Sequence, residues 1–191
     1  MARQNRRFVP RLHAFDERVL PSVSVSYSPS DGVLLIQGTA ADDVIAITDT
    51  GKGDPGSVTV FDHGTAVFTS EGPVGQIMVV TGNGADTVDY RLTSDLATNR
   101  QITVDLGAGN DKFAAHLDGQ TLGANFLMQA LGRRGSDRLT LDAQHVSVGA
   151  GTWLTVNFQG GAGSDAVKFN YLPDFVDPTG VVKFTADQRI R

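Results

Sequence analysis

The sequence contains no cysteine and almost no glutamate. Without cysteine, the 191-residue chain has no disulfide framework, no cysteine-based metal site and no cysteine nucleophile. Its acidic residues are 19 aspartates and 2 glutamates, and it carries 22 glycines. Because aspartate and glycine favour turns and are poor helix formers, this composition predicts strands and turns rather than helices. No long segment shows a 3.6-residue apolar period, and no apolar run approaches membrane-spanning length. The sequence therefore predicts an all-β protein without a membrane span.

The usual sequence signatures of enzymes are also missing. There is no P-loop, no GxSxG elbow and no dinucleotide-binding fingerprint, since the glycine clusters lie between two strands rather than before a helix. The four histidines, His13, His63, His116 and His145, are scattered and form no HExxH pair, so we predict that none is a metal ligand or a base. Trp153, the only tryptophan, is predicted to be a packing or cap residue. These absences favour a non-enzymatic protein.

One strand–turn–strand unit stands out at residues 101–117. Apolar residues alternate with polar ones on both sides of a glycine-rich turn, which is the period-2 signature of half-buried strands. The turn itself is Gly107-Ala108-Gly109-Asn110-Asp111. Glycine permits the positive φ of a tight turn, and asparagine or aspartate can cap that turn with its own side chain.

This unit recurs five times when the chain is aligned on Asp43, Asp86, Asp111, Asp137 and Asp165. Apolar residues stand nine and seven positions before each aspartate, and again two and four positions after it. Two positions before the aspartate the residue is glycine in the last four copies and alanine in the first. Four apolar columns kept in register through five copies identify an internal repeat.

The spacing of the aspartates predicts the architecture. The last four lie 25, 26 and 28 residues apart, which fits coils of about 26 residues that hold two strands and a short third apolar segment. Stacked coils bury one continuous core that no single coil could bury. We therefore predict a parallel β-solenoid (β-helix or β-roll-like), with a β-sandwich as the alternative. The predicted core residues are Leu34, Ile36, Ile77, Val79, Ile102, Val104, Phe113, Leu139, Leu141, Val156, Phe158, Val167 and Phe169.

The chain divides into a basic leader and one repeat domain. Residues 1–21 carry five arginines and are predicted to be a disordered leader. Residues 22–191 form a single β-repeat domain, with coils centred on the five aspartates. Residues 50–75 are either a hairpin inserted into a coil or an irregular, shorter coil. Residues 181–185 continue the first strand of the repeat and are predicted to cap the stack.

The repeated turns resemble the hemolysin-type (RTX) calcium-binding repeats, whose unit is GGxGxDxUx. The segments that carry the resemblance are TGNGADTV, LGAGNDKF, QGGAGSDAV and GTAADDVI. In that family, turn carbonyls and the aspartate carboxylate bind Ca²⁺ between neighbouring turns, which suits an ion that takes about six to eight oxygen ligands. The Ca²⁺ ligands that the resemblance implies are the carboxylates of Asp43, Asp86, Asp111, Asp137 and Asp165 and the carbonyls of Gly82, Gly84, Gly107, Gly109, Gly161 and Gly163.

The match to that family is degenerate. The family's repeats follow one another about every nine residues, whereas here one such turn occurs in each coil of about 26 residues. The Asp137 turn has Arg133 in place of a glycine, and the Asp43 turn lacks both glycines. The best predicted calcium site therefore lies between the Asp86 and Asp111 turns.

A metal-free alternative explains the same turns as aspartate-capped. Coils stack about 4.8 Å apart, so ionised aspartates in a ladder would repel by about 1 kcal/mol per pair in water and by more at a lower dielectric. Calcium, turn amides or the arginines of the Asp137 turn could each neutralise or separate these charges. The sequence leaves this choice open.

Three functional expectations follow. The leading one is a non-enzymatic, extracellular or cell-surface repeat module that holds Ca²⁺ structurally between stacked turns. The second is a metal-free structural or adhesive module, and the third is a carbohydrate-active β-helix enzyme. Such enzymes need a charged cluster on one strand face, but the outward positions Met78, Thr103, Gln129 and Asn157 are neutral.

The expected partners are calcium ions and cell-surface or matrix components, and the acidic repeat domain gives no support for a nucleic-acid partner. Export is expected from the segment RRFVPRLHAFDERVLPS, which resembles the arginine-rich leader of many large bacterial surface proteins.

Overall fold

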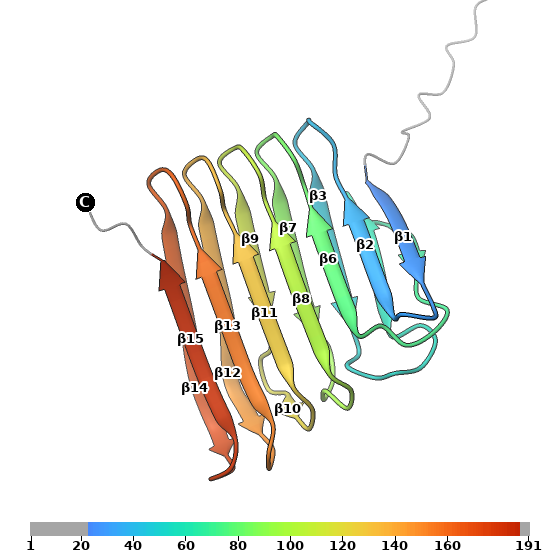
Figure 1. Cartoon of the computed structure of the whole chain (residues 1–191), viewed down its shortest axis with the longest axis vertical. Helices are drawn as coiled ribbons and strands as arrows, with labels where there is room; N and C mark the ends of the chain where they lie inside the picture. The colour runs from blue at the N-terminus through green and yellow to red at the C-terminus, as the bar shows by residue number, and fades with distance from the viewer. Residues whose placement is uncertain (1–22, 188–191) are drawn as a thin grey trace, which may run out of the picture.

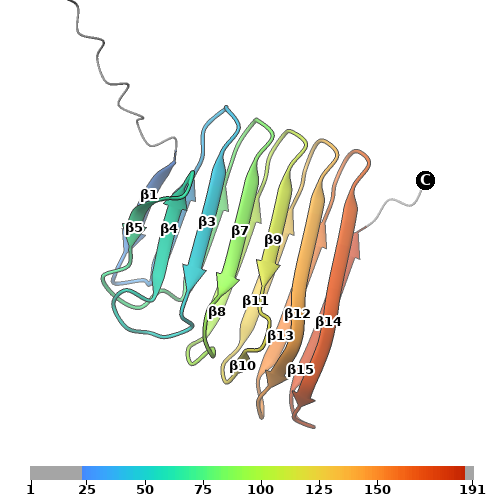
Figure 2. The same ribbon diagram turned by 180° about the vertical axis from the view of Figure 1, so that it is seen from behind.

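Two back-to-back sheets make up residues 23–187, the part of the chain that the computed structural model describes (Figure 1, Figure 2). The seven-stranded sheet faces the viewer in Figure 1 and contains, in spatial order, β1 (Ser24–Ser28), β2 (Val33–Gln37), β6 (Gln76–Val80), β8 (Arg100–Asp105), β11 (Phe126–Leu131), β13 (Trp153–Gln159) and β15 (Val181–Asp187). The eight-stranded sheet contains β3 (Val44–Asp49), β4 (Val58–Asp62), β5 (Thr65–Thr69), β7 (Thr87–Leu92), β9 (Lys112–His116), β10 (Thr121–Leu122), β12 (Arg138–Val148) and β14 (Ala166–Val176). Nowhere in these residues is there a helix long and apolar enough to cross a membrane.

Successive coils pair in parallel and in register. In the seven-stranded sheet, β2, β6, β8, β11, β13 and β15 each pair in parallel with the next. In the other sheet, β3, β7, β9, β12 and β14 do the same. This register stacks Ile77, Ile102, Met128 and Val156 in one inward-facing column. The predicted parallel β-solenoid is confirmed, and the β-sandwich alternative is wrong because Ile102 and Val156 belong to one sheet with parallel neighbours.

The core fills the space between the two sheets. Because strand side chains alternate between the two faces, every second residue of each aligned strand points inward, and eleven of the thirteen predicted core residues are at most 1% exposed. The prediction of full burial is wrong for Val167 and Phe169, which are only partly buried. Both lie on β14, the last strand of its sheet within the described residues, so no further coil covers them.

The third apolar segment of each coil does not form a third sheet. Leu122 pairs with Val148, Val148 pairs with Val176, and Leu96 forms a bridge to Leu122. These contacts extend the eight-stranded sheet, so each coil is flat and has two sides.

Antiparallel strands close the N-terminal end of the stack. β1 pairs antiparallel with β2, while β4 pairs antiparallel with β3 and β5 with β4. The segment 50–75 therefore contains a hairpin rather than a shorter coil. At the other end, β15 spans the predicted capping strand at 181–185 and pairs in parallel with β13. The predicted leader, residues 1–21, lies outside the described residues.

Candidate functional site

The five aspartate turns stack along one edge of the solenoid, the upper edge in Figure 1. Each turn carries the chain from a strand of the seven-stranded sheet to a strand of the other sheet. Parallel bridges join consecutive turns: Asn83 to Ala108, Ala108 to Arg134, and Arg134 to Ala162. The structure thus brings together turns that lie 25 or more residues apart in the sequence.

The aspartate carboxylates form a ladder of hydrogen bonds to backbone amides. The N–H of Asp43 donates to Oδ1 of Asp86 at 2.8 Å, and the N–H of Asp86 donates to Oδ1 of Asp111 at 2.8 Å. The same bond continues from Asp111 to Asp137 at 2.9 Å and from Asp137 to Asp165 at 3.0 Å. Four of the five carboxylates, those of Asp86, Asp111, Asp137 and Asp165, therefore cap the turn of the preceding coil. We call these five residues the aspartate ladder.

The second carboxylate oxygen is less well satisfied. In the first turn, Oδ2 of Asp43 accepts the N–H of Thr39 at 2.6 Å. The Oδ2 atoms of Asp86, Asp111 and Asp137 are buried and have no hydrogen-bond partner among the described residues. Burial is the main cause that raises the pKa of Asp86 and Asp137, and it raises the pKa of Asp111 from 3.8 to about 6, with the neighbouring carboxylates adding to the effect. Burial in the ladder therefore shifts the pKa of its central members upward, towards neutral pH.

The glycines of these turns are required by the close stacking of the coils. A Cβ placed on Gly109 would lie 1.6 Å from the carbonyl oxygen of Gly84, and one on Gly135 would lie 1.4 Å from that of Gly109. In each case the clash is with the preceding turn. The first turn has no preceding aspartate turn, which explains why it can carry Thr39 and Ala41 at the glycine positions. The glycine pattern thus has a cause that does not involve a metal.

The predicted carbonyl ligands are directed along the stack. The Gly82 carbonyl accepts the N–H of Ala108 at 2.8 Å, and the Gly107 carbonyl accepts the N–H of Arg134 at 3.1 Å. The carbonyls of Gly84 and Gly109 face the glycine of the next coil. Gly161 and Gly163 belong to the last aspartate turn. Within residues 23–187, no group of three or more acidic or histidine side chains is placed to hold a metal ion. The carbonyls of Gly82 and Gly107 therefore already serve as acceptors in the stacking of the turns.

Arg133 does not neutralise the aspartate ladder. It occupies a glycine position with a left-handed φ of 74°, and its guanidinium bonds to Asp105 of the preceding coil at 2.7 Å. That pair is on the surface: the Arg133 side chain is 54% exposed. The groups that stabilise the charge of the buried carboxylates are therefore the backbone N–H donors of the ladder, and not Arg133.

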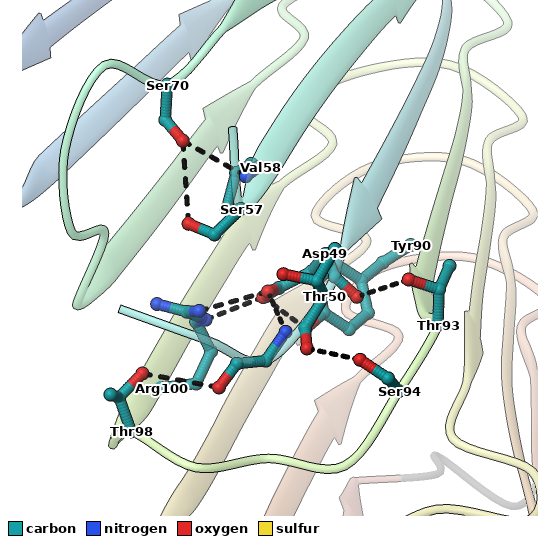
Figure 3. Close-up of polar contacts among 11 residues, drawn as sticks. Asp49, Thr50, Ser57, Val58, Ser70, Tyr90, Thr93, Ser94, Thr98 and Arg100 are labelled. Carbon is teal, nitrogen blue, oxygen red and sulfur yellow. Dashed lines mark hydrogen bonds and ion pairs between the residues drawn. The ribbon is translucent and has the colours of Figure 1, made fainter. Parts of the chain in front are cut away.

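A buried polar cluster inside the solenoid was not predicted (Figure 3). Arg100 donates from Nε to Oδ2 of Asp49 at 2.6 Å and from Nη2 to Oδ1 at 3.0 Å, and the Tyr90 hydroxyl donates to Oδ2 at 2.8 Å. The Arg100 and Asp49 side chains have no exposed surface. Burial, followed by the charge of Asp49, raises the pKa of Tyr90 well above its usual value. A charged residue in an otherwise apolar column, where Arg100 pairs with Phe126, was the sequence signal that could have indicated this cluster.

The cluster anchors the loop that leads into the inserted hairpin. The N–H of Gly51 donates to Oδ1 of Asp49 at 2.7 Å, and the hydroxyls of Thr93 and Ser94 donate to the carbonyls of Asp49 and Thr50. These contacts join the start of the insertion to the following coil. The arrangement is that of a structural ion pair, since the Arg100 and Asp49 side chains at its centre have no exposed surface.

Charged residues also gather on the outer face of the eight-stranded sheet. His116 on β9 lies between Asp89 on β7, at 3.2 Å from Nε2, and Asp142 on β12, at 3.5 Å from Nδ1. The prediction of a neutral outer face considered only the seven-stranded sheet. The charged residues at outward positions of the second strand in each coil, Asp89, His116 and Asp142, were visible in the sequence and would have predicted this cluster. These contacts join neighbouring coils across the sheet surface.

Comparisons with protein-family models, with curated proteins and with solved structures find no match. The class of the protein therefore rests on its fold, which is that of a parallel β-solenoid repeat protein.

Proposed function

We propose that the chain is a non-enzymatic structural repeat module whose aspartate–glycine turns hold the coils together without a metal. The observation that carries this proposal is that each turn contacts the preceding coil in two ways. One carboxylate oxygen caps the preceding coil, as Asp111 does for Asp86 at 2.8 Å, and the glycines admit the carbonyl of the preceding turn. Both features are accounted for by stacking alone.

An extracellular or cell-surface location is part of this proposal. It rests on the resemblance of the N-terminal segment to bacterial surface-protein leaders, and that segment lies outside the described residues. An adhesive role at a surface or matrix belongs to the same proposal.

In the metal-free module, the melting temperature (Tm) of the wild-type protein in chelator is expected to fall as the pH rises from about 4 to about 7. The folded state holds the Asp111 proton up to a pKa of about 6, whereas the unfolded chain releases it near 3.8, so stability is lost between these values. Asp111→Asn keeps the acceptor for Asp86 and removes the charge. It should therefore raise the Tm at neutral pH and flatten the profile.

The control for this experiment is Asp54→Asn, which removes the charge of an exposed aspartate far from the ladder. Its pH profile should follow that of the wild type. A wild-type Tm that is flat or rises over this range, with no gain from Asp111→Asn, would show that the ladder is not coupled to protonation.

Calcium binding is the second candidate function. It is supported by the three unpartnered, buried Oδ2 atoms of Asp86, Asp111 and Asp137, which form a column of anionic oxygens. Calcium would neutralise this column, and the carbonyls of Gly82 and Gly107, which the resemblance implies as further ligands, each already accept one backbone hydrogen bond.

If calcium binds, millimolar calcium should raise the wild-type Tm at neutral pH relative to chelator. At tenfold excess over the dissociation constant, one site adds about 1.4 kcal/mol by mass action. Asp111→Asn should abolish this rise, and Asp174→Ala, in the exposed pair with His145, should retain it. Equal wild-type melts in calcium and in chelator would reject the calcium proposal and leave the metal-free module.

A further inference from the structure

A recess opens on the outer face of the seven-stranded sheet, near the starts of β8, β11 and β13. These strand starts are at the lower edge of the sheet in Figure 1. Its cavity volume is about 260 Å³, and its lining includes Asn99, Gln101, Asn125, Leu127 and Trp153. These residues come from three consecutive coils, so the recess exists only when the coils are stacked. It lies on the opposite side of the molecule from the charged cluster around His116.

Trp153, which the sequence predicts to be a packing or cap residue, is partly exposed. Its side chain stands at the outward-facing start of β13, and the residue is 37% exposed. It is the only tryptophan in the chain. A large exposed aromatic side chain in a recess is informative, because most large apolar side chains of this protein are buried. The flat face of an indole ring packs well against the C–H faces of a sugar ring, and its N–H can donate a hydrogen bond.

The amide side chains beside Trp153 are held in place by the stack. Oδ1 of Asn99 accepts the N–H of Asn125 at 3.0 Å, and Oδ1 of Asn125 accepts the N–H of Trp153 at 3.2 Å. Because the oxygen of each amide is committed to the next coil, its Nδ2 group remains as a donor, and no hydrogen bond from either Nδ2 occurs within residues 23–187. Fixed polar groups beside an aromatic wall are the usual composition of a small-ligand site.

The side chains that form the recess are uncharged. Arg100 also borders it, but the Arg100 guanidinium is buried in the core on Asp49. The outward positions that continue along the sheet are Thr103, Gln129 and Asn157, which stand in register on neighbouring strands. Lys183 faces outward one coil beyond Thr155. Lys183 and the Arg133–Asp105 pair are charged groups elsewhere on this side of the molecule. The amides and hydroxyls at the recess itself match a neutral hydroxylated ligand better than a uronate or a phosphate.

We propose that this recess binds one sugar ring of a neutral polysaccharide, with Trp153 as the stacking platform and the Nδ2 groups of Asn99 and Asn125 as donors to sugar hydroxyls. The recess is smaller than the pockets of about 300–1,000 Å³ that enclose whole drug-sized ligands. The chain of sugars therefore extends beyond it, across the neutral face of the sheet. This site is independent of the aspartate ladder and of any metal there.

The test uses the single tryptophan as a reporter. Wild-type protein is titrated to millimolar concentrations with cellohexaose, mannohexaose and a hexamer of galacturonic acid, and the fluorescence of Trp153 is followed. We expect a saturable change with at least one neutral hexamer and a weaker effect of the charged one. No saturable change with either neutral hexamer, or tighter binding of the galacturonate, would overturn the proposal.

Variants measured by calorimetry separate this site from others. Trp153→Ala should weaken binding of the neutral hexamer by about tenfold or more, and Trp153→Phe by less, because the aromatic face is retained. Asn125→Ala should also weaken binding. Gln159→Ala, at the far end of β13, is the matched control and should bind like the wild type. Equal affinity of Trp153→Ala and wild type would place the sugar elsewhere and reject the assignment.

Discussion

Replacement of Asp49 by alanine is expected to lower the free energy of unfolding by about 3–5 kcal/mol. The change leaves the Arg100 guanidinium buried without its counter-ion, and one of its nitrogens, Nη1, already lacks a hydrogen-bond partner among the described residues. It also removes the acceptor of the Tyr90 hydroxyl. For a chain of this size the loss corresponds to a fall in Tm of about 6–20 °C. Urea denaturation followed by circular dichroism measures it.

Two further variants test the cause of this loss. Asp54→Ala removes an exposed aspartate and should change stability by no more than about 0.5 kcal/mol. The triple variant Asp49→Leu, Arg100→Met and Tyr90→Phe replaces the cluster by apolar groups and should recover much of the stability, because of the groups bonded to the Asp49 carboxylate only the N–H of Gly51 is left without its acceptor. An Asp49→Ala variant as stable as the wild type would show that the buried charge is tolerated without its partner.

Of all glycine-to-alanine substitutions in the described residues, Gly135→Ala is expected to lower the stability of the fold most. Its Cβ would lie 1.4 Å from the carbonyl oxygen of Gly109, so the two coils must separate, and the alanine must also adopt a φ of 137°. We expect a loss of about 4–5 kcal/mol or more, with failure to fold as the extreme outcome. Separation of the coils would also weaken the bond from Asp111 to Asp137, which is 2.9 Å long.

The control for this prediction is Gly119→Ala. Gly119 also has a positive φ, 73°, but a Cβ there would meet nothing within 4 Å. This variant carries only the cost of the left-handed conformation, roughly 1–2 kcal/mol. If Gly135→Ala and Gly119→Ala lose similar amounts of stability, backbone conformation rather than coil contact explains the glycine pattern.

The repeat register was available in the sequence because it rests on two periodic signals. Alternation placed Ile102 and Val104 on one face of a strand, and the recurring aspartate aligned them with Ile77 and Val79 of the preceding coil. Because alternation is local and the aspartates recur at a nearly fixed spacing, both signals can be recognised from the sequence alone. The five aspartates were identified as neighbours for the same reason. Alternation also predicts complete burial of Phe169, which is only partly buried, because alternation gives the inward face of a strand but not how completely the neighbouring strands cover it.

Only the tertiary structure shows which partners the charged, glycine and tryptophan residues contact. Asp49 and Arg100 lie 51 residues apart and share no repeat position, so only the fold brings them together. The direction of the Asp111 carboxylate and the role of Gly109 depend on atoms of the neighbouring coil less than 4 Å away. Trp153 became an exposed residue because its side of the strand carries no covering layer. The sequence by itself therefore determined which residues stack, since stacking follows from periodicity. Contacts between residues that do not share a repeat position, such as Asp49 and Arg100, could be found only from the tertiary structure.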